Sequence, residues 1–244
     1  MTSTSEIRIA GGIEYDLNDM YVSVQGEGCL TGVPMVVVRL MGCPVGCPFC
    51  DTKETWNAET QHRRQFVDFD AWKGATPEWS RTTAQQIARK ARELAGEWVN
   101  WIMLTGGEPA QQRLKALVDA FHAERFSVGL ETSGTAVGHI DAGCDWVTVS
   151  PKIGMPGGMS IKPGALALAH EIKFVIGKEA DVLKMGEFYH EFASVIGSAH
   201  PDLPAEKCVQ PMSQSAKATE LCVKLAREKG YRLSIQVHKY VGLA

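Results

Sequence analysis

The chain has 244 residues, of which 45% are hydrophobic and 22% are charged, and its formal net charge at pH 7 is −3. This composition is ordinary for a globular protein, and a slightly acidic chain lacks the basic footprint of a duplex-binding protein. Residues 1–6 contain no basic segment followed by an apolar run, so we expect no export signal. No stretch approaches the ~18 apolar residues of a membrane span. Seven cysteines without an export signal predict a cytoplasmic protein, in which clustered thiols indicate a metal site or catalysis.

Short apolar segments recur along the chain, and helical patterns lie between several of them. Near-continuous apolar runs are typical of parallel strands that are buried on both faces. Residues 1–20 alternate only weakly and predict a leader or an edge strand. Helical patterns follow Thr83 and Asp181 and surround Leu114 and Leu221, and the last of them ends at Gly230. The six apolar segments are residues 35–40, 101–104, 127–130, 146–149, 172–176 and 207–210.

The strand–helix rhythm predicts an α/β fold made of right-handed βαβ units with a parallel sheet. Six strands are too few for a complete eight-stranded barrel. We therefore expect an open, partial (β/α)6 barrel, with a doubly wound open sheet as the alternative. In either architecture the loops that follow the strands carry the functional site.

Residues 53–82 interrupt this rhythm. They are mostly polar and show no clear period, so they are interpreted as an insertion into one domain that spans residues 1–244. The scattered aromatic side chains are expected to pack this insertion onto the body of the protein; they are Trp56, Phe66, Phe69, Trp72 and Trp79.

Polar motifs follow five of the six predicted strands. Because the ends of parallel strands meet at one rim of the sheet, these motifs are expected to lie close together. They are a cysteine loop after the first strand, Thr105-Gly106-Gly107-Glu108-Pro109 after the second, Glu131-Thr132-Ser133-Gly134 after the third, Ser150-Pro151-Lys152 after the fourth and Gln210-Pro211-Met212 after the last.

The cysteine loop holds Cys43, Cys47 and Cys50 at C-x3-C-x2-C spacing. Its glycine and prolines disfavour a regular helix or strand, so the three thiols can converge from a loop. A structural zinc site normally has four ligands in paired spacing, and the remaining cysteines and histidines stand alone. A [4Fe–4S] cluster held by three thiolates instead leaves one iron open for a small molecule. The spacing favours such an open cluster.

This spacing, with Phe49 before the last cysteine, resembles the signature of radical S-adenosylmethionine (SAM) enzymes. The resemblance implies that SAM chelates the open iron and is cleaved reductively to a 5′-deoxyadenosyl radical. The cofactor then supplies the chemistry and the protein supplies orientation. The residues implied as SAM contacts are Phe49, Cys50, Asp51, Gly107, Glu108, Ser133, Ser150, Pro151, Lys152, Gln210, Pro211, Met212 and Ser213.

A combination of further segments is similar to the 7-carboxy-7-deazaguanine synthase family, in its proteobacterial branch. These segments are residues 24–28, 32–34, 39–47, 50–53 and 236–240. The resemblance implies a radical ring contraction of 6-carboxytetrahydropterin to 7-carboxy-7-deazaguanine with loss of ammonia, on the route to queuosine and other 7-deazapurines. It also implies Mg2+ with Thr52 as its protein ligand, a flavodoxin-type reductant and a homodimer.

The residue types near the cysteines suit such a substrate. Arg39 can hold a carboxylate in a bidentate geometry that lysine cannot reproduce. Glu27 and Gln25 can pair with the amino-pyrimidinone edge of a pterin. The full set expected at the substrate is Val24, Gln25, Gly26, Glu27, Arg39, Thr105, His238 and Ala244.

Two other functions fit the three cysteines. A glycyl-radical-enzyme activase shares the cluster and SAM but acts on a protein. A non-catalytic iron–sulfur or zinc protein would use the thiols for electron transfer or structure alone. The pairing of Thr52 with Arg39 and Glu27 favours an enzyme with a small acidic substrate over an activase. Iron and sulfide counts after anaerobic reconstitution would distinguish the non-catalytic protein.

Overall fold

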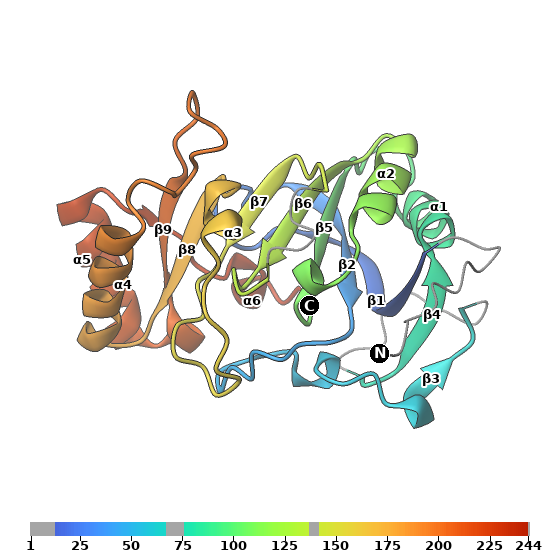
Figure 1. Cartoon of the computed structure of the whole chain (residues 1–244), viewed down its shortest axis with the longest axis horizontal. Coiled ribbons are helices and arrows are strands. Elements are labelled where there is room, and N and C mark those ends of the chain that lie inside the picture. The colour runs from blue at the N-terminus through green and yellow to red at the C-terminus, as the bar shows by residue number, and fades with distance from the viewer. Residues whose placement is uncertain (1–12, 67–75, 137–141, 244) are drawn as a thin grey trace, which may run out of the picture.

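A single ten-stranded sheet organises the described part of the chain, residues 13–66, 76–136 and 142–243 of a computed structural model (Figure 1). The strand order across the sheet is β10-β9-β8-β7-β6-β5-β2-β1-β4-β3. The strands are β1 (Glu14–Val24), β2 (Pro34–Leu40), β3 (Arg63–Arg64), β4 (Trp79–Thr83), β5 (Trp101–Gly106), β6 (Ser127–Thr132), β7 (Trp146–Val149), β8 (Glu171–Ile176), β9 (Glu206–Pro211) and β10 (Arg232–Leu233).

The six predicted strands are β2 and β5 to β9. Each pairs in parallel with the next one along the chain, from β2·β5 to β8·β9. This is the α/β partial barrel that the strand–helix rhythm predicts, and within the described residues the sheet is not closed into a full barrel.

The helices begin and end where local sequence signals place them, with one shift. The α1 helix starts with a capping box between Thr83 and Gln86, and α5 ends at Gly230, whose φ is +73°. The α4 helix begins at Glu179, two residues before Asp181, because the Asp181 carboxylate accepts the backbone N–H groups of residues 177 and 178. The helices are α1 (Ala84–Ala95), α2 (Lys115–Ala123), α3 (Pro163–Ala167), α4 (Glu179–Glu191), α5 (Ala216–Lys229) and α6 (Val237–Tyr240), with short 3-10 turns η1 (Lys53–Thr55), η2 (Thr60–His62), η4 (Pro109–Gln111) and η5 (Met212–Gln214).

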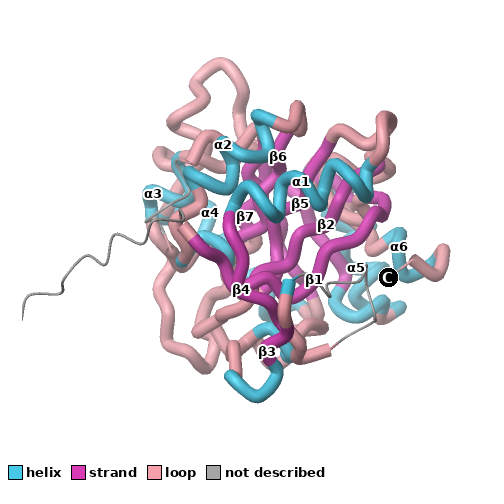
Figure 2. Tube along the Cα trace, turned by 90° about the vertical axis from the view of Figure 1, so that its right-hand side faces the viewer, coloured by secondary structure: helices cyan, strands magenta, loops and turns pink. Residues whose placement is uncertain are grey.

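The helices that connect the strands cover the outer face of the sheet. Helices α1 and α2 pack side by side, α1 against β1 and β2 and α2 against β6, while α4 packs on β8 and α5 on β9 (Figure 2). None of the helices in the described ranges is both long and apolar enough to cross a bilayer.

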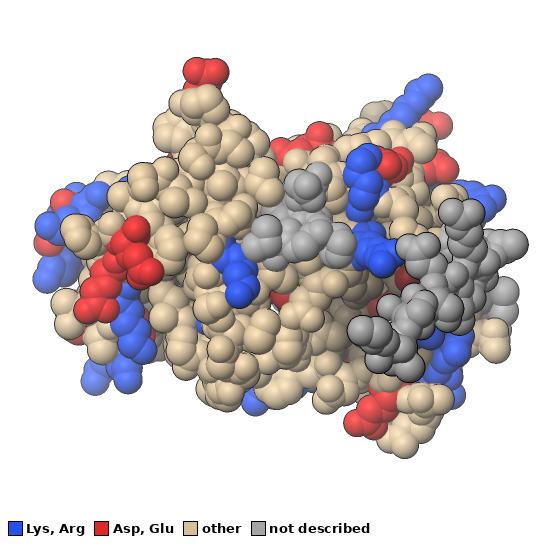
Figure 3. All heavy atoms as spheres, viewed as in Figure 1, with Lys and Arg blue, Asp and Glu red and all other residues tan. Residues whose placement is uncertain are grey.

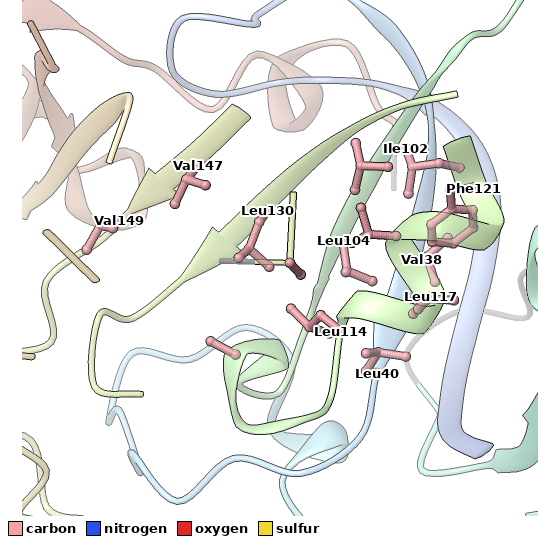
Figure 4. Packing of buried hydrophobic residues seen from close by; sticks show 14 of the residues in the cluster. Val38, Leu40, Ile102, Leu104, Leu114, Leu117, Phe121, Leu130, Val147 and Val149 are labelled. Atoms are coloured by element: carbon pink, nitrogen blue, oxygen red, sulfur yellow. The ribbon is translucent and has the colours of Figure 1, made fainter. Parts of the chain in front are cut away.

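The core lies between the sheet and these helices, and it uses alternate strand residues. Figure 4 shows one outward-facing row from β2 to β7 that meets the apolar face of α2. The expectation of strands that are apolar and buried on both faces holds only in part. The inward positions mix apolar side chains such as Val37 and Met103 with polar ones such as Arg39 and Glu131, and these line a cavity. The outward row is Val38, Leu40, Ile102, Leu104, Leu130, Val147 and Val149, and the α2 face is Leu114, Leu117 and Phe121.

Strand β1 is neither a leader nor an edge strand. It lies inside the sheet, antiparallel to both β2 and β4. Its register shifts between Leu17 and Asp19, a bulge that keeps Leu17 and Met20 in the core while Asp19 and Tyr21 line a cavity on the other face. Residues 1–12 lie outside the described residues.

The segment 53–82 contributes more structure than its sequence indicates. Its second half forms β4, which extends the sheet next to β1, and Trp79 is buried there. Phe66 packs against the core as expected, whereas Phe69 and Trp72 lie outside the described residues. Strand β4 was missed because Ser80-Arg81-Thr82 carries little apolar character.

Candidate functional site

A cavity of about 750 Å³ lies at the ends of the parallel strands. It is lined by the inward positions that alternate with the core positions, including Arg39, Thr105, Glu131, Lys173 and Gln210. Pro151 does not line it, and Ala244 lies outside the described residues. The other sequence-predicted site residues all line it: Val24, Gln25, Gly26, Glu27, Arg39, Cys43, Cys47, Phe49, Cys50, Asp51, Thr52, Thr105, Gly107, Glu108, Ser133, Ser150, Lys152, Gln210, Pro211, Met212, Ser213 and His238.

The cysteine loop is held against two other loops by backbone hydrogen bonds. The N–H groups of Gly42 and Cys43 donate to the carbonyls of Thr55 and Trp56, at 2.7 and 3.1 Å. On the other side the Gly157 N–H donates to the Val45 carbonyl at 3.0 Å. The three thiols therefore face the cavity from a loop that is fixed on both sides.

The paired glycines after β5 allow that strand end to touch the cysteine loop. The N–H groups of Gly107 and Glu108 donate to the carbonyls of Leu40 and Gly42, at 2.8 and 2.7 Å. A Cβ atom at Gly106 would lie 2.2 Å from the Leu40 carbonyl oxygen, and one at Gly107 would lie 2.2 Å from the Gly42 carbonyl oxygen. Only glycine fits this backbone contact.

The Glu108 carboxylate joins two segments at the rim, residues 108–110 and residues 132–133. One carboxylate oxygen accepts the Thr132 hydroxyl at 2.6 Å and the Ala110 N–H at 3.1 Å, and the other accepts the Ser133 N–H at 2.7 Å. The carboxylate therefore anchors the end of β6 to the turn after β5.

A half-buried lysine, Lys152, lies beside Phe49, the aromatic residue of the cysteine loop. Lys152 donates to the Ser150 hydroxyl at 2.6 Å, and its ammonium lies 5.7 Å from the Phe49 ring centroid. Burial lowers the pKa of Lys152, although the nearby Cys47 thiol opposes the shift.

The backbone at Ser213 and Gln214, which also line the cavity, has positive φ values of +51° and +57°. Such values are rare for residues other than glycine.

Arg39 projects into the cavity from the end of β2. Its Nη2 atom donates to the Tyr21 hydroxyl at 3.1 Å, and among the described residues no carboxylate forms an ion pair with it. Asp19 is nearby and 6% exposed. Burial raises the pKa of Asp19 to about 6. The positive charge of Arg39 opposes this rise, and the negative charge of Glu54 adds to it.

An ion cluster, formed by Lys173, Glu27 and Glu131, crosses the floor of the cavity. The sequence placed Glu27 at the substrate and Glu131 in a rim motif, but it did not predict Lys173 or the cluster. The Lys173 ammonium is 2.6 Å from the Glu27 carboxylate and 3.1 Å from the Glu131 carboxylate. Burial alone would raise the pKa of Glu27, but Lys173 and the Gln236 amide bring it to about 2. Burial raises the pKa of Glu131 to about 7, against the attraction of Lys173. The signal was a lone lysine inside the apolar segment 172–176.

The C-terminal segment closes one wall of the cavity. The Val237 N–H donates to the Gly26 carbonyl at 2.9 Å, and the Gln236 amide donates to Glu27 at 2.7 Å. His238 packs so closely that a Cβ atom on Gly26 would lie 2.0 Å from its Nδ1 atom. Lys239 forms an ion pair with Asp51 at 3.2 Å, which links this wall to the cysteine loop.

The donor set of the cysteine loop fits a multi-iron cluster better than one metal ion. Two thiolates on one zinc ion lie at most about 4.6 Å apart, since each Zn–S bond is about 2.3 Å. Among the described residues, the group of potential ligands within 4.8 Å of one another is Cys29, Glu171 and Cys208, not the cysteine loop. Burial raises the pKa values of Cys43 and Cys47, and neighbouring thiols add to the rise, so three thiolates here need a cationic centre.

Comparisons with known proteins agree with this site. Residues 37–159 match the profile of the Radical SAM superfamily, so the fold and the three-cysteine rim are those of a radical SAM enzyme. The 7-carboxy-7-deazaguanine synthases of Escherichia coli (strain K12) and of Buchnera aphidicola subsp. Schizaphis graminum are 35% and 30% identical, over 95% and 93% of this chain and 100% and 98% of their own. The crystal structure of QueE from Escherichia coli superposes with a TM-score of 0.82 at 34% identity, covering 97% of this chain and 100% of that one. The chain belongs to the 7-carboxy-7-deazaguanine synthase family.

Proposed function

We propose that this chain converts 6-carboxytetrahydropterin to 7-carboxy-7-deazaguanine with loss of ammonia, as a radical SAM lyase of queuosine and 7-deazapurine biosynthesis. The observation that carries the proposal is the placement of Arg39 and Thr52. These residues flank the cysteine loop in sequence and line the same cavity as its three thiols. A guanidinium that forms no ion pair with any carboxylate of the described residues suits a small carboxylate substrate.

The cysteine loop would hold a [4Fe–4S] cluster through Cys43, Cys47 and Cys50. When bound, the cluster would supply the electron for the reductive cleavage of SAM. The chain's own part would be to position SAM. Residues 107–108 and Ser133 would contact its methionine end, while Ser150, Lys152 and residues 210–213, which also line the cavity, would contact the rest of the molecule. Pro151, which does not line the cavity, would act only by shaping that loop.

The substrate would lie between Arg39 and the ion cluster. Arg39 would bind the carboxylate of the substrate. Glu27, which Lys173 keeps ionised, would accept hydrogen bonds from the N–H groups of the amino-pyrimidinone edge. Gln25, Thr105 and the backbone at Val24 and Gly26 would complete that edge. His238 and Ala244 would close the pocket from the C-terminal segment. Water is excluded where Gln236 and Val237 seal this segment onto residues 26–27.

Thr52 would provide the protein ligand of a Mg2+ ion. Its hydroxyl lies 3.7 Å from the Cys50 thiol, so an ion on this hydroxyl would be next to the cluster site. Mg2+ usually keeps several waters and takes few protein ligands, and one hydroxyl beside a substrate carboxylate meets this preference.

Further properties follow from the same proposal. The chain would work as one domain with residues 53–82 inserted, as a homodimer reduced by a flavodoxin-type protein in the cytoplasm. The seven cysteines carry no disulfide, which suits a reducing compartment. Charges of both signs are interspersed on the face shown in Figure 3, which supports the expectation that the protein binds no nucleic acid.

The test is to incubate the anaerobically reconstituted protein with SAM, a reductant, Mg2+ and 6-carboxytetrahydropterin, and to follow the pterin by mass spectrometry. Loss of ammonia from the pterin is expected. SAM cleavage beside intact pterin would refute this substrate and favour an activase. Stoichiometric zinc with no iron or sulfide in the cysteine loop would refute the enzyme itself.

A further inference from the structure

A second group of potential metal ligands lies outside the cavity, in the interior of the partial barrel. Cys29 comes from the loop between β1 and β2, Glu171 from the start of β8, and Cys208 from β9. Their ligand atoms all lie within 4.8 Å of one another, and the two thiols are 3.9 Å apart. None of the three lines the cavity, and the proposed reaction uses none of them.

The carboxylate of this group is left incompletely satisfied. Glu171 is 1% exposed. Its Oε2 atom accepts a hydrogen bond from the Cys29 N–H at 2.8 Å, but its Oε1 atom is buried and has no hydrogen-bond partner among the described residues. A buried, unpaired carboxylate oxygen is costly unless a proton or a cation compensates it. The hydroxyl of Tyr189 is close enough to interact electrostatically with Glu171 and Cys208. It is likewise buried without a partner in the part of the chain that the structure describes.

We propose that Cys29, Cys208 and Glu171 bind a zinc ion, as a site separate from the cysteine loop. Two thiolates on a tetrahedral zinc ion lie about 3.8 Å apart, given Zn–S bonds of about 2.3 Å, and the observed separation is 3.9 Å. Thiolates favour soft metals, and a carboxylate added to two thiolates favours zinc over Cu(I). A water molecule would take the fourth position.

The surroundings offset part of the charge of such a site. Three anionic ligands and one zinc ion carry a net charge of −1. Arg232 on β10 lies close enough to the group that the Cys29 thiol raises the pKa of its guanidinium, and Cys208 and Glu171 add to this rise. Lys173 lies two residues along β8 from Glu171, but it already compensates Glu27 and Glu131. Arg232 is therefore the cation that favours deprotonated thiols at this position.

The zinc ion would tie the loop between β1 and β2, which carries Glu27, to the sheet. Cys29 lies two residues after Glu27, and Gly28 between them packs so tightly that a Cβ atom would lie 2.2 Å from Glu171 Oε1. The Gly28 N–H also donates to the Ser234 hydroxyl at 2.8 Å. The zinc ion would therefore act as a structural clip that fixes the position of Glu27. This inference does not rest on the proposed function.

The test uses the full-length holoenzyme and needs no activity measurement. Elemental analysis after dialysis should find about one zinc ion per chain in addition to the iron. Zinc K-edge X-ray absorption reports on zinc without interference from iron, and it should show two sulfur neighbours at about 2.3 Å and oxygen neighbours at about 2.0 Å.

Variants identify the ligands. Cys29→Ser and the isosteric Glu171→Gln should each weaken zinc binding at least about tenfold in a chelator competition, with iron content unchanged. Cys144→Ser, a thiol outside the group, should retain the zinc. Zinc binding unchanged in both ligand variants, or a Cys29–Cys208 disulfide in the anaerobically isolated protein, would overturn the proposal. If the variants do not fold, the wild-type spectrum decides, because a zinc shell without two sulfur atoms excludes this site.

Discussion

The Lys173 ammonium lies 2.6 Å from the Glu27 carboxylate, although the two residues are 146 positions apart in the chain. Lys173 is 2% exposed, and it also contacts Glu131. One buried cation thus serves two carboxylates, and the electrostatics of the cavity floor depend on it.

Replacing Lys173 with methionine should destabilise the protein by about 3–5 kcal/mol, because two buried carboxylates lose their cation. Without Lys173, burial raises the pKa values of both Glu27 and Glu131 above that of an unfolded glutamate. The folded state then binds more protons than the unfolded state, so stability falls as the pH rises. Denaturant unfolding should therefore show a larger loss at pH 8 than at pH 5.

The matched control is Lys207→Met, which removes an exposed lysine from the adjacent strand β9. Its ammonium lies 4.8 Å from the centroid of the Tyr189 ring, so its removal should change stability by at most about 1 kcal/mol, to the same extent at both pH values. An equal loss at both pH values for Lys173→Met would mean that lost packing, rather than unpaired charge, dominates.

Gly107→Ala should displace the cysteine loop. The new methyl group would lie 2.2 Å from the Gly42 carbonyl oxygen, and backbone there cannot move without breaking the hydrogen bonds of residues 107 and 108. Reconstituted iron per chain should fall several-fold. Gly186→Ala is the control: this exposed position in α4 has no atom within 4 Å of the added Cβ, and alanine should stabilise the helix by about 0.5–1 kcal/mol. Normal iron content in Gly107→Ala would show that the close contact is dispensable.

Asp19→Asn should stabilise the protein at pH 8 and leave it unchanged at pH 4. Burial raises the folded-state pKa of Asp19 to about 6, whereas the ordinary pKa of an aspartate is 3.8, so the folded state holds the proton more tightly than the unfolded state does. The stability of the wild type therefore falls as the pH rises from about 4 to 6, by about 2 kcal/mol. An asparagine does not ionise and avoids this loss.

Asp16→Asn is the contrasting variant on the same strand, because it removes a carboxylate that is stabilised by an ion pair rather than destabilised by burial. Asp16 forms an ion pair with Arg81 at 2.7 Å, so its removal should destabilise the protein by at most about 1 kcal/mol. Unfolding measured at both pH values separates the two variants. If Asp19→Asn also destabilises the protein at pH 8, the ionised Asp19 carboxylate is stabilised in the folded state by more than its contacts with Met20 and Arg39.

Arg39→Lys should weaken substrate binding about 10- to 100-fold, since a charge-assisted bidentate contact contributes about 1.5–3 kcal/mol. Uncoupled cleavage of SAM should continue, because Arg39 is assigned to the substrate rather than to SAM. Tyr21→Phe, which removes only the hydroxyl that Arg39 contacts, should have a smaller effect. Equal loss of substrate turnover and SAM cleavage in Arg39→Lys would contradict the carboxylate role.

The six parallel strands and the rim motifs could be predicted because each depends on local sequence. An apolar run, a turn and a polar cluster lie within a few residues of one another. Lys173 and Asp19 could not be predicted in this way. Lys173 is kept charged by Glu131 on β6 and by Glu27 in the loop after β1, which are both distant in sequence. Asp19 faces the cavity because of the bulge in β1. Strand β4 was equally hidden, since its position in the sheet comes from pairing with β1 rather than from its own polar sequence.

The contact between Gln236 and Glu27, which spans 209 positions, also sets an order of assembly. During synthesis the cysteine loop and its supporting strands leave the ribosome long before residue 236 does. The thiols are thus in place while one wall of the cavity is still missing. Residues 236–239 complete that wall, whereas the backbone hydrogen bonds of the cysteine loop go to Thr55, Trp56 and Gly157 and do not depend on it.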